Sequence, residues 1–265
     1  MQFIMDLNAL RFVFASVFGL LMGSFGNVCI HRLPRKESIV RPRSHCPKCN
    51  ALIAWFDNIP IFSFILLKGR CRHCKERISF IYPAIEFLSA SLGVLSLVKF
   101  GWGIEALLYY LFLWGLLIII IIDVRHMIIP NALTFPGIII GLLGAATQVL
   151  PVSFWQSFIG ALVGGGLLWV VGYLYYKVTG RMGLGGGDIK LMAVNGAFLG
   201  VDLTILTLFI SSLLGAIVGV YLILIRKKSS KYAIPFGPYI AAGGAISLFF
   251  GYELLKIYGG VSLLP

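Results

Sequence analysis

The stretch LLYYLFLWGLLIIIIID, residues 107–123, carries no charge until it ends at Asp123. An apolar run of this kind is typical of a membrane helix. A second aspartate, Asp188, follows the glycines of GLGGGDIK, residues 183–190, just before another apolar stretch. An ionisable group at a membrane segment is costly, so each aspartate is a candidate functional residue. Two carboxylates that share one site would indicate acid–base chemistry on a water molecule, as in an aspartic protease.

Composition extends this interpretation to the whole chain. Of its 265 residues, 59% are hydrophobic and 12% are charged, whereas about 25% of the residues of a soluble domain are charged. We therefore predict an all-α polytopic membrane protein with about eight transmembrane helices. The predicted spans are residues 10–30, 80–98, 104–123, 132–150, 154–176, 188–201, 203–225 and 235–257. Because a span needs about 20 residues, the segment 188–201 fits least well.

The basic residues predict an orientation in the membrane. Of the 22 Lys and Arg residues, 19 lie in segments that eight spans place on one side. These segments are 31–80, Arg125, 177–190 and 226–231. The positive-inside rule puts them in the cytoplasm and both termini outside, whereas seven spans would move the C-terminal flank to the other side. This topology and contact with anionic lipid explain the net charge of +12, so we expect membrane lipid as a partner and no nucleic acid.

Three regions are expected along the chain. Residues 1–30 form a first transmembrane helix, which we interpret as retained because no small-x-small cleavage site follows it. Residues 31–80 form a small cytoplasmic loop domain with four of the five cysteines, and residues 81–265 form a transmembrane bundle. No internal repeat is evident in the sequence.

Cysteine spacing in the loop predicts a metal site. Cys46-Pro-Lys-Cys49 and Cys71-Arg-His-Cys74 offer four thiolates, which is the donor set of a structural Zn²⁺ site. Two disulfides or free thiols are the alternatives, and a reducing cytoplasm disfavours the disulfides. A loop of this size cannot build a sufficient core, so metal binding would supply much of its folding energy. We expect Cys29 to be a packing residue, and His45 and His73 to be surface groups.

Each acidic candidate also has a purely structural interpretation. Asp123 would pair with Arg125, and Asp188 would cap the helix that follows it. Both aspartates are predicted at the cytoplasmic boundary of the membrane, where other acids are scarce, and this favours a shared site. Glu86, one turn into the second span, would form a buried ion pair or contribute to a second site.

An ordered series of motifs along almost the whole chain resembles the bacterial type IV prepilin peptidases, also called prepilin leader peptidase/N-methyltransferases. The series comprises GSFGNVCIHRLP (23–34), PRSHCPKC (42–49), DNIP (57–60), GRCRHC (69–74), ISFIYPAIE (78–86), Asp123 with IPNALT (129–134), GGGDIKL (185–191) and IPFGP (234–238). The resemblance implies removal of the basic leader of prepilins or pseudopilins after a Gly, on the cytoplasmic side of the bacterial inner membrane. It also implies methylation of the new N-terminal residue, often Phe, with S-adenosylmethionine.

The resemblance assigns roles to individual residues. Asp123 and Asp188 would be the catalytic aspartates, and the Gly69-Arg70 step matches a position that is linked to methylation. S-adenosylmethionine would bind between the loop and the helices, with Glu86 and Asn27 as contributors. No strand followed by G-x-G-x-x-G is evident, so an ordinary Rossmann site is not expected. Gly186, at the variable position of the family's G-x-G-D motif, is unusually small and would loosen that turn.

Other classes of function stay open at the level of sequence. One alternative is a peptidase without methyltransferase activity, although the cysteine-bearing loop favours two activities. An ion-coupled transporter would use the carboxylates for ion or proton coupling, and it predicts charges near mid-membrane and broken helices in both halves. A zinc-stapled membrane scaffold explains the cysteines but gives no reason for Gly185–Gly187 ahead of Asp188.

Overall fold

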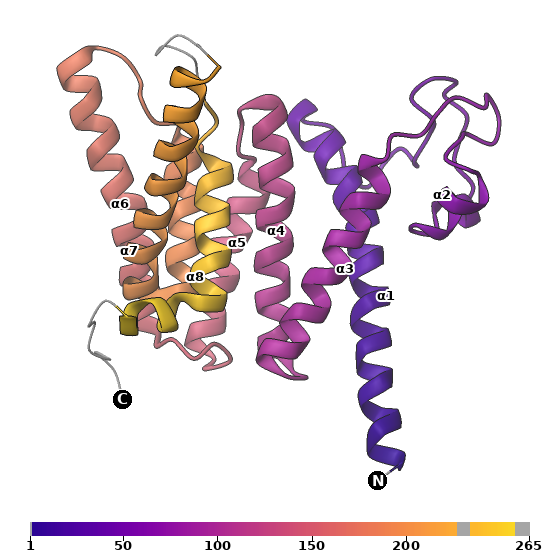
Figure 1. Ribbon diagram of the computed structural model, residues 1–265, viewed down its shortest axis with the longest axis horizontal. Coiled ribbons are helices and arrows are strands. Elements are labelled where there is room, and N and C mark those ends of the chain that lie inside the picture. The colour runs from indigo at the N-terminus through magenta and orange to yellow at the C-terminus, as the bar shows by residue number, and fades with distance from the viewer. Residues whose placement is uncertain (1, 227–233, 258–265) are drawn as a thin grey trace. The chain divides into compact units, whose positions relative to one another are not determined.

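The computed structural model of the protein describes residues 2–226 and 234–257 (Figure 1). The chain divides into two compact units, Met1–Trp114 and Gly115–Pro265. The predicted boundaries at 30/31 and 80/81 remain predictions. In the described ranges the chain is helical, and two isolated antiparallel bridges are its only β pairing. Lys227, Lys228 and Lys231, in the predicted basic segment 226–231, lie outside the described residues.

Two long helices pack together in the first unit, α1 (Gln2–Arg32) and α3 (Ile81–Phe100). Small residues let their backbones approach closely, as is common between membrane helices. A Cβ added at Gly19 would lie 2.5 Å from Cα of Ala90, and one at Gly23 would lie 2.6 Å from Cα of Glu86. The buried Ser89 hydroxyl donates to the Gly19 carbonyl over 2.7 Å, which fixes how the two helices are aligned.

The loop between α1 and α3 has a defined structure of its own. It contains η1 (Leu33–Arg35), η2 (Trp55–Asn58) and the short helix α2 (Phe62–Leu66), which packs against η2. At the end of α1, the buried Arg32 guanidinium donates to the carbonyls of Ser38 and Pro42 over 2.9 and 2.7 Å. The start of the loop is therefore fixed to the last turn of α1.

The second unit is a helical bundle. It holds the end of α4 (Ile104–His126), then α5 (Asn131–Ala146), α6 (Phe154–Thr179), α7 (Gly186–Leu224) and α8 (Gly237–Ile257). α7 packs against α5, α6 and α8, and Figure 1 shows it between α6 and α8. Inside α7, Gly200 has φ 74° and ψ −176°, a backbone conformation that glycine adopts far more readily than other residues.

The chain reverses its direction at Gly200. A Cβ added at Gly160 of α6 would lie 2.8 Å from the carbonyl carbon of Gly200. A Cβ added one turn further along α6, at Gly164, would lie 2.7 Å from Met192 and 2.9 Å from Thr204. Residues on both sides of Gly200 thus lie at the same level of α6. α7 is therefore a hairpin of two antiparallel arms, residues 186–199 and 201–224.

The eight predicted spans correspond to eight apolar helical segments, because 188–201 and 203–225 match the two arms of α7. In the described part of the chain, six helices are long and apolar enough to cross a membrane: α1, α3, α4, α6, α7 and α8. α5 has 16 residues, and it and the first arm of α7 fall short of the about 20 residues of a full span. The multi-pass membrane architecture is confirmed, and the number of full-length spans is smaller than predicted.

Candidate active site and metal centre

Asp123 lies in the last turn of α4 and is almost completely buried, with 4% of its surface exposed. Its Oδ2 accepts a hydrogen bond of 3.1 Å from the backbone N–H of Gly237, the first residue of α8. The described contacts of this carboxylate include no ion pair with Arg125, whose side chain is exposed. The alternative of a surface ion pair therefore does not account for Asp123.

Asp188 lies in the first turn of α7 and is 9% exposed. Its Oδ2 accepts a hydrogen bond of 3.1 Å from the N–H of Gly185, and its own N–H donates to the Gly185 carbonyl over 3.1 Å. Asp188 thus caps its helix, as the structural interpretation predicted, and the cap holds one oxygen of the carboxylate in place. Next to it, a Cβ added at Gly186 would meet nothing within 4 Å, so the backbone is open on that side.

The Ile129 side chain lies between Gly187, which is next to Asp188, and Gly237, which is bonded to Asp123. A Cβ added at Gly187, beside Asp188, would lie 2.8 Å from Cβ of Ile129. A Cβ added at Gly237 would lie 2.9 Å from Cδ1 of Ile129 and 2.6 Å from Oδ2 of Asp123. The fold therefore brings together two acids that lie 65 positions apart in the sequence.

Lys190 connects the start of α7 with the start of α5. Its Nζ donates to Oδ1 of Asn131 and lies 5.6 Å from the ring centroid of Phe135. The sequence motifs contained Ile129, Asn131, Lys190 and Gly237, but pattern reasoning gave none of them a role in the site. These residues contact partners that are far apart in the chain. In the sequence, their membership in the ordered motifs was the only signal that could have identified them.

The four loop cysteines lie on two equivalent turns, 25 positions apart. In the first turn the N–H of Cys46 donates to the Ala51 carbonyl over 2.9 Å, and in the second the N–H of Cys71 donates to the Glu76 carbonyl over 2.9 Å. Asn50 and Lys75, which follow the second cysteine of each turn, have positive φ angles of 56° and 61°. The structure therefore contains an internal repeat that sequence analysis missed.

The cysteine sulfurs converge in one cluster. The Sγ atoms of Cys46, Cys49, Cys71 and Cys74 all lie within 4.8 Å of one another. The Sγ atoms of Cys46 and Cys74 are 3.9 Å apart, far longer than the about 2.0 Å of a disulfide, and the cysteines are free. Four thiolates around Zn²⁺, at about 2.3 Å from the ion, would lie about 3.8 Å from one another. The cluster has the donors and the spacing to hold a metal ion.

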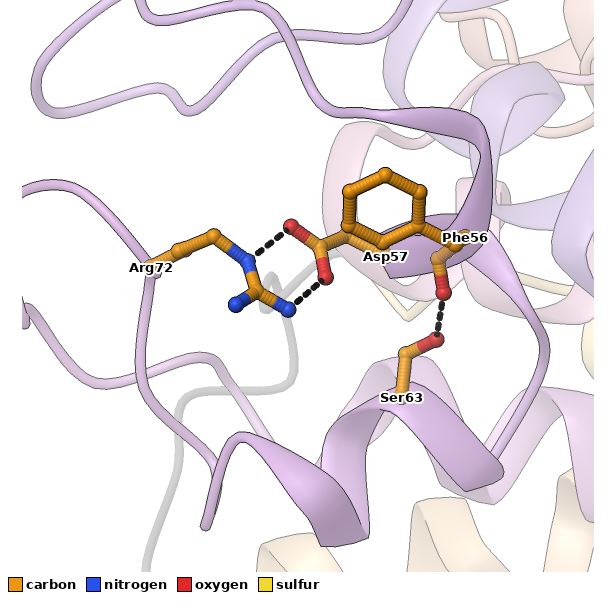
Figure 2. A network of polar contacts seen from close by, with 4 residues as sticks. All are labelled: Phe56, Asp57, Ser63 and Arg72. Carbon is orange, nitrogen blue, oxygen red and sulfur yellow. Dashed lines mark hydrogen bonds and ion pairs between the residues drawn. The ribbon is translucent and has the colours of Figure 1, made fainter.

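A charged pair attaches the second cysteine turn to η2 (Figure 2). The Arg72 guanidinium donates to both carboxylate oxygens of Asp57, over 2.7 and 2.6 Å, and lies 5.4 Å from the Phe56 ring centroid. The Ser63 hydroxyl in α2 donates to the Phe56 carbonyl over 2.8 Å. Hydrogen bonding and the positive charge of Arg72 lower the pKa of Asp57. The cysteine cluster, η2 and α2 are thereby linked. The sequence pointed to Asp57 only through the DNIP motif.

The four residues predicted to bind the methyl donor lie in two different settings. Asn27 and Glu86 are buried, and they are already hydrogen-bonded. The Asn27 amide donates to the Tyr82 carbonyl over 3.1 Å, and Oε2 of Glu86 accepts from the N–H of Ile61 over 2.8 Å. Gly69, with φ 66°, and the exposed Arg70 lie in the second cysteine turn.

Comparison with known proteins identifies the family of the chain. The family model described as "Bacterial Peptidase A24 N-terminal domain" matches residues 17–100, and that described as "Type IV leader peptidase family" matches residues 110–220. A protein of Pseudomonas putida named "Prepilin leader peptidase/N-methyltransferase" is 38% identical over 262 residues, which is 91% of each chain. Proteins of the same name from Aeromonas salmonicida (strain A449) and Bacillus subtilis (strain 168) are 38% and 35% identical, over 94% and 91% of this chain and 94% and 95% of their own. No solved structure matches the chain. Similarity of this extent means that the chain belongs to the type IV leader peptidase family, together with the prepilin leader peptidase/N-methyltransferases.

Proposed function

We propose that the chain is a membrane aspartic endopeptidase that also methylates its product. Its substrates are type IV prepilins or pseudopilins, whose basic leader it removes after a Gly, and the new N-terminal residue is then N-methylated. The observation that supports this most strongly is the pair of buried aspartates, Asp123 and Asp188, whose neighbours Gly237 and Gly187 both lie against Ile129. The family to which the chain belongs supplies the substrate class.

The two carboxyl groups supply the acid and the base for hydrolysis of a peptide bond. One carboxylate accepts a proton from water as the water oxygen attacks the carbonyl carbon of the Gly residue. The other carboxyl, which is protonated, donates its proton to the carbonyl oxygen. When the tetrahedral intermediate collapses, the C–N bond breaks and the leaving amine takes up the proton that the first carboxylate received from water. A hydroxyl of the intermediate returns a proton to the second carboxylate, which restores the pair. The pair titrates as one unit, so the two roles belong to the pair.

Backbone donors prepare the pair for this chemistry. The N–H groups of Gly237 and Gly185 each engage one oxygen of Asp123 and Asp188, respectively. This fixes the orientation of each carboxyl and leaves its second oxygen for proton transfer. The open space beside Gly186 gives an extended substrate backbone room to lie next to Asp188.

We propose Zn²⁺ as the metal of the cysteine cluster. Cys46, Cys49, Cys71 and Cys74 would hold it, and it would stabilise a loop too small for a core of its own. Through the Asp57–Arg72 pair, the metal would also fix η2 and α2. Its role would be structural, since four thiolates complete a tetrahedral site.

S-adenosylmethionine, which carries an electrophilic methyl group, is the proposed methyl donor. The exposed Arg70 presents a guanidinium, a group suited to the carboxylate of that molecule, and the preceding Gly69 has a positive φ. Asn27 would contribute by holding Tyr82 at the start of α3, and Glu86 by holding Ile61 of the loop. Together they would fix the position of the loop relative to the helices.

The orientation that we propose follows from charge and family. The protein would lie in the bacterial inner membrane with its basic segments, its loop domain and both aspartates at the cytoplasmic side. Cleavage would then take place where the basic leader of a prepilin lies. In a transporter, by contrast, the acids would be expected near mid-membrane.

A single incubation tests the proposed function. Purified protein in detergent is mixed with a synthetic prepilin, with and without S-adenosylmethionine, and the products are weighed by mass spectrometry. We expect loss of the leader after the Gly in both samples, and one methyl group on the product only when the donor is present. Cleavage without methylation would reduce the function to a peptidase. Failure to cleave a cognate substrate, with the protein folded, would contradict the proposal.

A further inference from the structure

The loop domain exposes four large apolar side chains, which we call the apolar face: Trp55, Phe62, Ile65 and Leu66. Their exposed fractions are 75%, 57%, 65% and 65%, respectively. Residues 62, 65 and 66 share one side of the short helix α2, because side chains three and four positions apart are neighbours on a helix. On the other side, Ser63 is buried and bonded to η2, which carries Trp55. An apolar group of this size on a small polar domain calls for a covering partner.

The position of α2 relative to α3 indicates that the membrane is the partner that covers the apolar face. Ile61, which immediately precedes α2, donates its N–H to Glu86 of α3 over 2.8 Å. Glu86 is five residues after Ile81, the first residue of α3, and so lies about 7.5 Å along that helix. α3 has 20 residues, about the length that the hydrocarbon core requires, so its first turns lie at the edge of the core. The start of α2 is therefore held at the level of the bilayer boundary.

The second attachment of α2 lies at the same place. The ring centroid of Phe64 in α2 is 6.3 Å from that of Phe80, the residue just before α3. The loop is also joined at both ends to candidate membrane spans, α1 and α3. These contacts all lie within the first unit of the chain, and they leave α2 little freedom to move away from the membrane.

The charges of the loop indicate which lipids would contact it. Residues 31–80 contain eleven Lys and Arg residues but only Glu37, Asp57 and Glu76 as acids. Lys68, just after α2, is exposed, as are Arg41, Arg43 and Lys48 near the first cysteine turn. Exposed apolar side chains in a strongly basic segment are typical of regions that lie in the interface of an anionic membrane.

We propose that the loop domain rests on the membrane, with its apolar face inserted among anionic phospholipids of the leaflet next to the loop. Trp55 and the outer side of α2 lie in the interfacial region, and the basic residues contact lipid phosphates. This placement holds the metal cluster at the membrane surface, because Asp57 and Arg72 tie η2 to the second cysteine turn. The placement does not depend on the proposed activity.

Fluorescence of Trp55 tests the proposal in the full chain. The protein is reconstituted into vesicles of phosphatidylglycerol or of phosphatidylcholine, each with bromine on the upper part of the acyl chains. The emission of Trp55 is obtained as the difference between the wild type and Trp55→Phe. We expect brominated phosphatidylglycerol to remove most of this emission, and brominated phosphatidylcholine or high salt to weaken the effect. Acrylamide in the water should quench Trp55 only slightly.

A charge placed on the apolar face serves as the second test. Ile65→Asp with Leu66→Asp should abolish the quenching of Trp55 by brominated lipid, whereas Val40→Asp, at an exposed loop position that is not part of the apolar face, should leave it unchanged. Trp55 that is quenched by acrylamide but not by brominated lipid would overturn the proposal and leave the face to a protein partner. Equal quenching in both lipids, without salt dependence, would overturn the assignment to anionic lipid.

Discussion

The backbone N–H of Gly237 donates a hydrogen bond to the carboxylate of Asp123 over 3.1 Å, although 114 positions separate the two residues. The contact joins the end of α4 to the start of α8. A Cβ at position 237 would lie 2.6 Å from Oδ2 of Asp123, so a larger residue there would displace the carboxylate. The proposed catalytic carboxylate is thus oriented by a backbone that must come unusually close to it.

Gly237→Ala should therefore lower the rate of prepilin cleavage by about a hundredfold, since a shift of about 1 Å at a reacting group costs about that much. The matched control is Gly219→Ala, in the second arm of α7 and outside the proposed site, where an added Cβ meets nothing within 4 Å. The control should cleave at a rate close to that of the wild type. Mass spectrometry measures the cleavage rate of each variant. The thermal midpoint of each variant checks that it is folded. Equal rates for the two variants would show that the close contact at Gly237 has no catalytic consequence.

Gly196→Ala should destabilise the second unit. An added Cβ at this position would overlap the backbone of Gly160, where α6 and α7 cross. Backbone atoms cannot rotate away, so we expect a loss of about 1–3 kcal/mol, in the range of overpacked cores. Gly166→Ala, in α6 with no atom within 4 Å of its added Cβ, should change little. Thermal unfolding in detergent measures the stability of both variants. A midpoint for Gly196→Ala that is no lower than that for Gly166→Ala would contradict the close contact between α6 and α7.

Cys71→Ser should remove the metal. We expect the wild-type protein to contain about one zinc ion per chain and the variant to contain almost none, because a structural site uses all four ligands. The loop should then be cut faster by protease, since the metal supplies much of its stability. Cys29→Ala, which removes the buried cysteine of α1, is the control and should keep its zinc. Full zinc content in Cys71→Ser would refute the four-thiolate site.

Glu86→Ala should loosen the loop domain without removing the metal. Its carboxylate is the acceptor for the N–H of Ile61, whose φ of 59° is unusual for a β-branched residue and needs support from its surroundings. We expect faster proteolysis in residues 55–66 and reduced methylation, with cleavage of prepilin less affected. Glu86→Gln keeps an acceptor oxygen at that position, so it should resemble the wild type. Methylation lost equally in both variants would point to direct contact between the carboxylate and the methyl donor.

Apolar length and charge were enough to predict the helical membrane fold from the sequence. The break between segments 188–201 and 203–225 also corresponded to the turn at Gly200. Sequence reasoning overestimated the number of full spans, because α5 and the first arm of α7 are apolar but short. Hydropathy reports whether a segment prefers lipid, and it does not by itself report how far the helix extends.

The sites were harder to predict in detail. The cysteine cluster followed from spacing alone, but SHCPKCNALI and GRCRHCKERI, residues 44–53 and 69–78, share only their cysteines and a final Ile. Their equivalence is one of backbone hydrogen bonds, which sequence patterns do not display. The partners of Asp123 and Glu86 are likewise backbone N–H groups of Gly237 and Ile61, whereas sequence reasoning looked for charged side chains.

The central claim is that Asp123 and Asp188 together cleave the leader peptide. The most direct measurement compares prepilin cleavage by the wild type, Asp123→Asn and Asp188→Asn, each purified, shown to be folded and assayed with the same synthetic substrate. Asparagine keeps the size and an acceptor for the Gly237 and Gly185 N–H groups, but it cannot accept and return a proton. The account predicts that both variants stay folded and that neither cleaves. Wild-type cleavage by either folded variant would contradict it.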